Sequence, residues 1–340
     1  MNSPFPSDLN RRRFISMLTA AAAAAPLAVA ADASQAKKKK KSTDAAPGAA
    51  KTSAPAPGPT TIHVFSKPLQ WLSYDGTAKL LAENGFGGID YTVRAGGHVL
   101  PEKVREDLPR AVEAARKAGL KVEMITTDIT DAREPHAEAV VKTAAQLGVK
   151  FYRLGVFKHD EKVGVYESLQ KLKPVFKSLA DLNQAHGIHG AIQNHAGNRV
   201  AAPLWDVFEL VRDLDPRWLG LQYDIRHATV EGGQSWPVTL KLLHRWIRCT
   251  DLKDFKWVQS PGRAVIENVP IGEGIVNFDQ YFKLVRELGI GGPTSVHFEY
   301  PPFERVAKPL SDAEKLKAFA AQMRRDLDAI KAFRAKQQLT

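Results

Sequence analysis

The 340-residue chain has few of the features that cross-link or anchor a protein. Its single cysteine, Cys249, excludes an intramolecular disulfide and a Cys-x-x-Cys metal site. The apolar stretch Met17–Val29 is about a dozen residues long, whereas a helix needs roughly 20 to cross a bilayer. Hydrophobic residues make up 44% of the chain, which is ample for a large core and excludes a fully disordered protein.

The positive charge is concentrated near the N-terminus. The formal net charge of +11 would by itself favour a nucleic-acid partner. Residues 1–59, however, contain nine Lys and Arg residues against three Asp, so more than half of the excess belongs to this segment. The rest is spread over residues 60–340 without a run, and we therefore expect no nucleic-acid partner.

The first sixty residues have the composition of an export signal followed by a linker. Arg11 to Ile15 reads Arg-Arg-Arg-Phe-Ile, which resembles the twin-arginine (Tat) motif, and Ala28-Val29-Ala30 has the pattern of a cleavage site. We therefore expect a Tat-type signal peptide over residues 1–30 and a periplasmic protein. Residues 31–60 are rich in Lys, Ala and Pro and predict a disordered linker, whose Lys37–Lys41 run is expected to contact anionic membrane or cell wall.

From residue 61 onward, β-rich runs alternate with amphipathic helical stretches. The eight predicted strands are Ile62–Ser66, Gly88–Val93, Lys121–Thr127, Phe151–Val156, Ile188–Asn194, Leu219–Ile225, Trp246–Leu252 and Thr294–Glu299. The predicted helices include Asp75–Asn84, Pro109–Lys117, His136–Leu147, Tyr166–His186, Phe278–Leu288 and a last helix opened by Ser311 and running to about Lys336. Eight such units predict an α/β fold, a single (β/α)₈ TIM barrel over residues 61–340. An open doubly wound sheet is disfavoured because no Gly-x-Gly-x-x-Gly follows the first strand.

Polar residues follow the last four predicted strands. Period-two alternation pairs Gln193 with His195, Asp224 with Arg226, Asp251 with Lys253, and His297 with Glu299. Functional residues of a TIM barrel lie at these carboxyl ends, so the pairs predict one shared polar site. Their oxygen and nitrogen atoms suit a hard or borderline divalent cation.

These motifs resemble the xylose isomerase-like TIM barrels, which include sugar phosphate isomerases/epimerases, inosose dehydratases and, more distantly, endonuclease IV. The resemblance covers nearly all of residues 61–304. It rests on Gln193-Asn194-His195, on Asp224 with His227, on Asp251-Leu252-Lys253-Asp254, on Pro270 to Gly274 and on Glu299.

The resemblance implies a divalent metal held by Gln193, Asp224, Asp251 and Glu299. Two positions depart from the family pattern, which has Glu in place of Gln193 and His in place of Asp251. The oxygen-rich set favours Mn²⁺ or Mg²⁺ over Zn²⁺. Because glutamine cannot take a proton, the departure at Gln193 disfavours epimerisation by two glutamates.

The function that the resemblance implies is a metal-assisted sugar isomerase or epimerase. Glu299 would remove the proton next to a carbonyl, and His195, His227 or Lys253 would supply a proton. The candidates for binding the small carbohydrate substrate are Arg153, Arg226, His297 and Trp71. The alternatives are a keto-sugar or inosose lyase (dehydratase) that uses the same enolisation, and a non-catalytic carbohydrate-binding barrel.

Overall fold

The computed structural model describes residues 60–304 and 308–339. The predicted signal peptide and the predicted linker, apart from its last residue, lie outside this range. Within the described residues, no helix combines the length and the apolar character that a membrane span requires.

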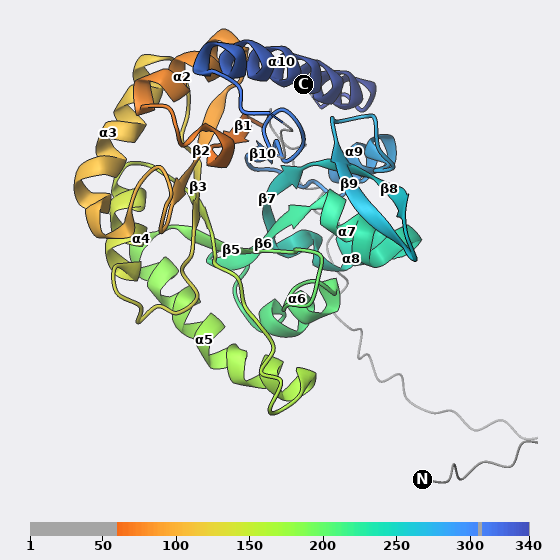
Figure 1. Cartoon of the computed structure of the whole chain (residues 1–340). Helices are drawn as coiled ribbons and strands as arrows, with labels where there is room; N and C mark the ends of the chain where they lie inside the picture. The colour runs from red at the N-terminus through yellow and green to blue at the C-terminus, as the bar shows by residue number, and fades with distance from the viewer. Residues whose placement is uncertain (1–59, 305–307, 340) are drawn as a thin grey trace, which may run out of the picture. The chain divides into compact units, whose positions relative to one another are not determined.

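Eight parallel strands close into a barrel in the order β1-β10-β7-β6-β5-β4-β3-β2 (Figure 1). The bounds of these strands are β1 Ile62–Phe65, β2 Gly88–Val93, β3 Met124–Thr127, β4 Phe151–Arg153, β5 His189–Gln193, β6 Leu219–Asp224, β7 Ile247–Leu252 and β10 Thr294–Val296. All eight predicted strands are present, and the predicted (β/α)₈ barrel is confirmed. The last strand ends at Val296 rather than at the predicted Glu299, so its polar residues lie beyond the ladder.

Helices surround the barrel and connect its strands (Figure 1). Their bounds are α2 Tyr74–Glu83, α3 Val104–Lys117, α4 Ala137–Gln146, α5 Val165–His186, α6 Leu204–Val211, α7 Ile225–Gly232, α8 Trp236–Leu243, α9 Phe278–Glu287 and α10 Asp312–Lys336. Helix α10 begins with the predicted capping box, in which the side chains of Ser311 and Glu314 bond each other's backbone N–H. Helix α3 begins five residues before the predicted Pro109, because Val104 and Leu108 are buried and the proline removes only one backbone bond.

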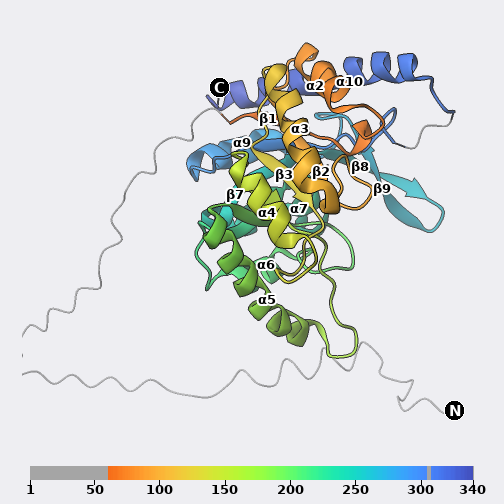
Figure 2. The ribbon, with the colours of Figure 1, turned by 90° about the vertical axis from the view of Figure 1, so that its left-hand side faces the viewer.

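A β-hairpin that was not predicted from the sequence lies between β7 and α9. Strand β8 (Asp254–Ser260) pairs antiparallel with β9 (Arg263–Val269), and Gly262 in the turn has a φ of 78°. Figure 2 shows the hairpin extending away from the barrel. Most of its residues are exposed or half-buried, so it lacks the apolar run that marked the barrel strands.

The barrel interior contains polar groups beneath the carboxyl ends of the strands. Asp90 on β2 is fully buried and accepts hydrogen bonds from Thr126 Oγ1 (3.0 Å) and Ser295 Oγ (2.8 Å). Burial raises the pKa of Asp90 to about 6. Cys249 on β7 is also buried, and burial raises the pKa of its thiol, which disfavours a reactive role.

Candidate functional site

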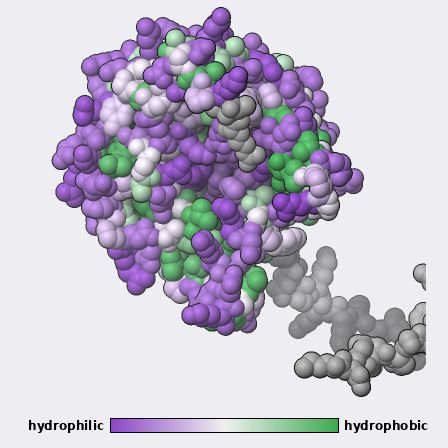
Figure 3. Space-filling model, viewed as in Figure 1, coloured by the Kyte–Doolittle hydropathy of each residue, from purple (hydrophilic) through white to green (hydrophobic). Residues whose placement is uncertain are grey.

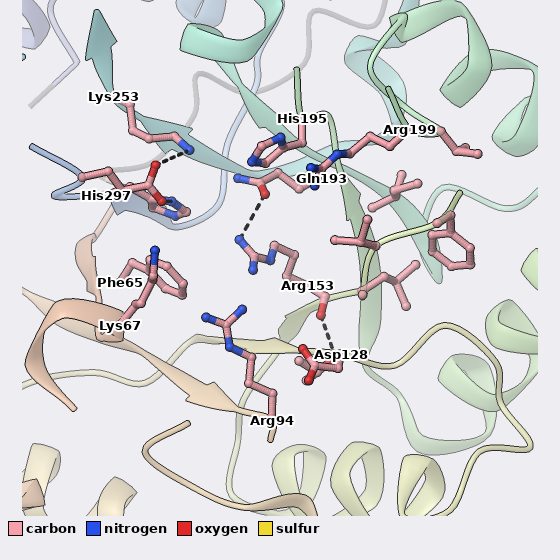
Figure 4. A pocket seen from close by; sticks show the side chains of 18 residues that line it. Phe65, Lys67, Arg94, Asp128, Arg153, Gln193, His195, Arg199, Lys253 and His297 are labelled. Atoms are coloured by element: carbon pink, nitrogen blue, oxygen red, sulfur yellow. Dashed lines mark hydrogen bonds and ion pairs between the residues drawn. The ribbon is translucent and has the colours of Figure 1, made fainter. Parts of the chain in front are cut away.

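A cavity of about 230 Å³ opens where the barrel strands end. In Figure 3 it is the hollow near the centre of the face shown, with mostly hydrophilic residues around it. Figure 4 shows its side chains at close range. Six of the predicted site residues line this pocket: Arg153, Gln193, His195, Lys253, His297 and Glu299.

Two buried carboxylates lie next to this pocket without lining it. Asp224 and Asp251 are register partners on the adjacent strands β6 and β7, so their side chains lie on the same side of the sheet. With His297 they form a buried group whose ligand atoms all lie within 4.8 Å of one another. The Nε2 atom of His297 is 3.2 Å from Asp251 Oδ1. Burial raises the pKa of Asp224. Burial also acts to raise the pKa of Asp251, but His297, Arg153 and Lys253 together outweigh it and the pKa is lowered.

Lys253 connects these acids to the pocket. Its Nζ atom is 3.0 Å from Asp224 Oδ2 and 3.4 Å from Glu299 Oε2, and its side chain is only 3% exposed. The same atom is 2.9 Å from His227 Nε2. Burial by itself would lower the pKa of Lys253, but Asp224 and Glu299 outweigh it and the pKa is raised, so the ammonium form persists. In turn Lys253, followed by His297, overcomes the effect of burial on Glu299 and holds the pKa of this carboxyl well below its usual range.

Gln193 presents its amide nitrogen to the acids. Its Nε2 donates to Asp251 Oδ2 at 2.6 Å and to Asp224 Oδ2 at 3.2 Å, while its Oε1 accepts from Arg153 Nη1 at 3.1 Å (Figure 4). A guanidinium has donors only, so Arg153 selects this orientation of the amide. Gln222 on β6 adds a second amide donor to Asp251 at 2.7 Å.

His195 and His227, two of the predicted site histidines, have their ring centroids 3.9 Å apart and their planes tilted by 30°. His195 lines the pocket, and its Nδ1 lies 2.9 Å from the carbonyl oxygen of Ala196, which leaves Nε2 as the acceptor. Burial, and then Lys253, lower the pKa of His195 to about 4. His227 is 2% exposed and does not line the pocket, and burial lowers its pKa well below the usual value. Both rings are therefore neutral near pH 7.

Arg226 and Asp254 connect the site to the hairpin and to the loop that follows it. Arg226 Nη1 is 2.9 Å from His227 Nδ1, and its Nη2 donates to Asn268 Oδ1 on β9. Asp254 accepts from four backbone N–H groups, among them those of Gly272 (3.0 Å) and Gly274 (2.9 Å). Arg226 was predicted to bind substrate, but the structure places its guanidinium between His227 and the hairpin, outside the pocket lining.

Trp71 is not brought to the pocket. Its indole Nε1 donates to the Pro68 carbonyl (3.1 Å), and its ring packs edge-on against Phe319 of α10 at 6.3 Å. It lines a separate apolar depression with Pro302 and Phe303.

Three cationic residues of the pocket were not predicted. Lys67, Arg94 and Arg199 line it together with Arg153, and Figure 4 shows the guanidinium groups of Arg94 and Arg153 pointing into the same space. Arg94 directly follows β2, so the rule that polar residues gather at strand ends would have found it if applied to the early strands. Lys67 directly follows the predicted first strand, Ile62–Ser66, so the same rule would have found it, whereas Arg199 lies in the irregular connection between β5 and α6.

The divalent metal that the family resemblance implies would need ligand atoms with lone pairs free to bind it. Asp224, Asp251 and His297 are ligand types of the right chemistry and are close together. In this arrangement, however, Gln193 offers the acids a nitrogen with two N–H donors and no lone pair for a metal. The carboxylates of Asp224 and Glu299 already contact the Lys253 ammonium. As arranged, these residues do not fit a divalent ion.

Several solved structures are similar to this chain. A structure of L-ribulose 3-epimerase shares 14% identity and a TM-score of 0.60, with coverage of 82% of this chain and 97% of that one. The probable 3-DHS dehydratase AsbF from Bacillus anthracis shares 17% identity and a TM-score of 0.58, with coverage of 78% and 97%. The IOLI protein, whose structure has a bound zinc atom, shares 17% identity and a TM-score of 0.62, with coverage of 81% and 99%. At these identities the likeness establishes the fold alone. No curated protein sequence matches the chain.

The family model described as xylose isomerase-like TIM barrel matches residues 78–322, most of the described barrel. This match confirms the resemblance drawn from the strand-end motifs. The chain therefore belongs to the xylose isomerase-like TIM barrel family.

Proposed function

We propose that this barrel is a sugar isomerase- or epimerase-like enzyme that removes a proton next to the carbonyl of a sugar, keto-sugar or inosose. The observation that carries the proposal is Glu299, an ionised carboxylate that lines the pocket while a buried ammonium lies 3.4 Å from it. A carboxylate is a base for an acidic C–H group, and an adjacent fixed cation stabilises the negative charge that develops on the substrate.

The residues around Glu299 have separate roles in the remaining proton transfers. When Glu299 takes the proton, the electron pair of the broken C–H bond moves toward the carbonyl oxygen, and the Lys253 ammonium donates a hydrogen bond to that oxygen. Neutral His195 presents Nε2 to the pocket and can accept and return a hydroxyl proton. His227 is buried behind Lys253, and its role is to position the lysine rather than to contact substrate.

Return of the proton decides the type of reaction. Delivery by Glu299 to the neighbouring carbon gives aldose–ketose isomerisation, whereas loss of a β-hydroxyl group gives a lyase. Epimerisation by two opposed bases is disfavoured, because Gln193 has no titratable proton and is bonded to Arg153 and to two acids.

The pocket favours a substrate with a negative charge. Among the described residues, no carboxylate lies within ion-pair distance of Arg94, Arg153 or Arg199, although all three line the pocket. Burial, and then the neighbouring Arg153, lower the pKa of Arg94, as expected for cations held close together. A carboxylate or phosphate of the substrate would relieve this repulsion through charge-assisted hydrogen bonds. We therefore propose a sugar acid or a phosphosugar.

The resident Mn²⁺ or Mg²⁺ that the family resemblance implies, on Gln193, Asp224, Asp251 and Glu299, is not part of this proposal. The Lys253 ammonium and the Gln193 amide already occupy the carboxylate oxygens, so no step of the reaction is assigned to a metal.

The experiment is proton exchange followed by NMR. Purified protein is incubated in D₂O with keto-sugars, inososes, sugar acids and phosphosugars, and deuterium entry next to the carbonyl is recorded. Exchange by the wild-type protein that is lost in Glu299→Gln supports the proposal. Binding of a sugar without exchange would favour the non-catalytic carbohydrate-binding barrel instead.

We also propose that the protein is exported to the periplasm by the Tat pathway, on the basis of residues 11–30. Cell fractionation of wild type and of the double variant Arg11→Lys, Arg12→Lys tests this, because retention of the variant in the cytoplasm is expected. The Lys37–Lys41 run is proposed to adhere to anionic surfaces. Vesicle binding that survives deletion of residues 31–60 would contradict that role.

A further inference from the structure

We infer that Lys253 supplies the positive charge of this site, so that the pocket works without a resident divalent metal. The inference concerns which cation the carboxylates hold, and it stands whether or not the proposed sugar chemistry is correct. It reverses what the family resemblance implied for Gln193, Asp224, Asp251 and Glu299.

The position of the Lys253 ammonium disfavours a metal at this site. Lys253 Nζ lies between the carboxylates of Asp224 on β6 and Glu299 beyond β10, at 3.0 and 3.4 Å. These are two of the groups that the resemblance assigns to the metal. A metal bonded to Asp224 at an ordinary distance of about 2.1 Å would lie within roughly 5 Å of the ammonium, in a buried place where like charges repel strongly.

Asp251 is already held by donors of the chain. Its Oδ2 accepts from Gln193, and its Oδ1 accepts from Gln222 while lying 3.2 Å from His297. Amide N–H groups cannot ligate a metal. An ion at this place would therefore have to compete with these donors for the oxygens of Asp251.

The side-chain amide of Gln193 is also held in its present orientation. Rotation of its amide would direct Oε1 at Asp224 and Asp251 and would place the NH₂ group against the Arg153 guanidinium. The rotation would exchange three favourable hydrogen bonds for donor–donor and acceptor–acceptor contacts. The Arg153–Gln193 pair thus maintains the arrangement that excludes the metal.

The side chain of Lys253 is also anchored by its place in the fold. It follows the last residue of β7, and its ammonium donates to Asp224 and Glu299, while His227 Nε2 lies 2.9 Å from it. A cation delivered by the chain in this way is present whatever the metal content of the medium. We therefore expect chelators to leave the protein unchanged.

The test measures metal binding and not turnover. Full-length wild-type protein is purified without chelator, its metal content is determined by mass spectrometry, and it is then titrated with Mn²⁺ while free Mn²⁺ is followed by electron paramagnetic resonance. Substoichiometric native metal and no Mn²⁺ binding at micromolar concentrations are expected. One tightly held divalent ion per chain in the purified wild type would overturn the inference.

Two variants sharpen the test. Removal of the ammonium in Lys253→Ala leaves Asp224 and Glu299 without their cation, so Mn²⁺ is expected to bind this variant at least about tenfold more tightly than wild type and to raise its Tm. The matched control is Lys256→Ala, which removes an exposed lysine paired with Glu267 on the hairpin and is expected to behave as wild type. Equal Mn²⁺ binding by wild type and Lys253→Ala would contradict the inference. If Lys253→Ala does not fold, the wild-type titration alone tests the inference. Proton exchange that persists in chelator-treated wild-type enzyme would support the sugar chemistry independently of the metal result. Failure of one proposal can then be told from failure of the other.

Discussion

Arg153 Nη1 donates to Gln193 Oε1 at 3.1 Å, and this bond determines which end of the glutamine amide meets Asp224 and Asp251. The relationship joins two neighbouring strands, β4 and β5. It means that a position expected to supply a metal ligand instead supplies hydrogen-bond donors to two buried acids.

The charge at position 193 is the first testable consequence. Gln193→Glu places a third carboxylate within hydrogen-bond distance of two buried ones and removes their amide donor. Although Arg153 would offset part of the added charge, we expect a loss of about 2–4 kcal/mol in the free energy of unfolding at pH 7, partly regained near pH 5 as a carboxyl protonates. Urea unfolding at pH 7 and near pH 5 measures the free energy of unfolding of the variant and of wild type.

The control for this variant is Gln146→Glu, which adds the same charge at an exposed position at the end of α4. It is expected to unfold like wild type. A Gln193→Glu protein as stable as wild type without added metal would mean that the site accommodates a third acid, contrary to the donor arrangement described above.

Glu299 is the second target. Glu299→Gln keeps the shape of the side chain but removes the base, so we expect the rate of deuterium exchange next to the carbonyl to fall by about 10²–10⁴-fold. Glu267→Gln on the exposed hairpin is the matched control and should exchange at the wild-type rate. Exchange that persists in Glu299→Gln would assign the base to another residue, with His195 the next candidate.

The cationic lining predicts selectivity between charged and neutral sugars. We expect Arg94→Gln to weaken binding of a sugar acid by roughly 10- to 100-fold, the effect of losing a charge-assisted hydrogen bond, and to change the binding of its neutral analogue far less. Isothermal titration with D-glucuronate and D-glucose compares the two. Arg105→Gln, on the exposed face of α3, is the control. Equal affinity of wild type for both sugars would refute the proposed preference.

We expect the buried carboxyl of Asp326 to make the free energy of unfolding depend on pH. This residue of α10 is 1% exposed and accepts from Tyr300 Oη at 2.8 Å, and burial raises its pKa to about 7 despite that bond. A raised pKa means that the folded state binds the proton more tightly, so stability is fully present below the unfolded pKa of about 4 and is lost as pH rises through 7. The loss is about 4 kcal/mol.

Asp326→Asn removes this titration while retaining an acceptor for Tyr300. The difference in unfolding free energy between variant and wild type should therefore grow in favour of the variant between pH 5 and pH 8. Urea unfolding across that range provides the measurement, and a difference that stays constant with pH would show that Asp326 does not titrate there.

The sequence contained enough information for the barrel and for the location of its site. Strand positions follow from runs of Val, Ile, Phe and Tyr separated by helices with glycine stops, and these are local patterns. The hairpin β8–β9 was missed because its residues are mostly exposed and have no apolar run. Trp71, predicted as a substrate contact, lies outside the pocket lining because an aromatic residue near a strand end packs equally well against a helix, here α10.

By itself the sequence determined which residues reach the carboxyl ends of the barrel, because a strand has a fixed period and a parallel barrel brings all such ends to one face. Only the tertiary structure decided how those residues share their hydrogen bonds. Whether Gln193 offers an oxygen or a nitrogen to the buried acids depends on Arg153 from another strand. Whether Asp224 and Glu299 hold a metal or an ammonium depends on where the Lys253 ammonium lies. Those outcomes depend on distances between strands, which no local pattern in the chain records.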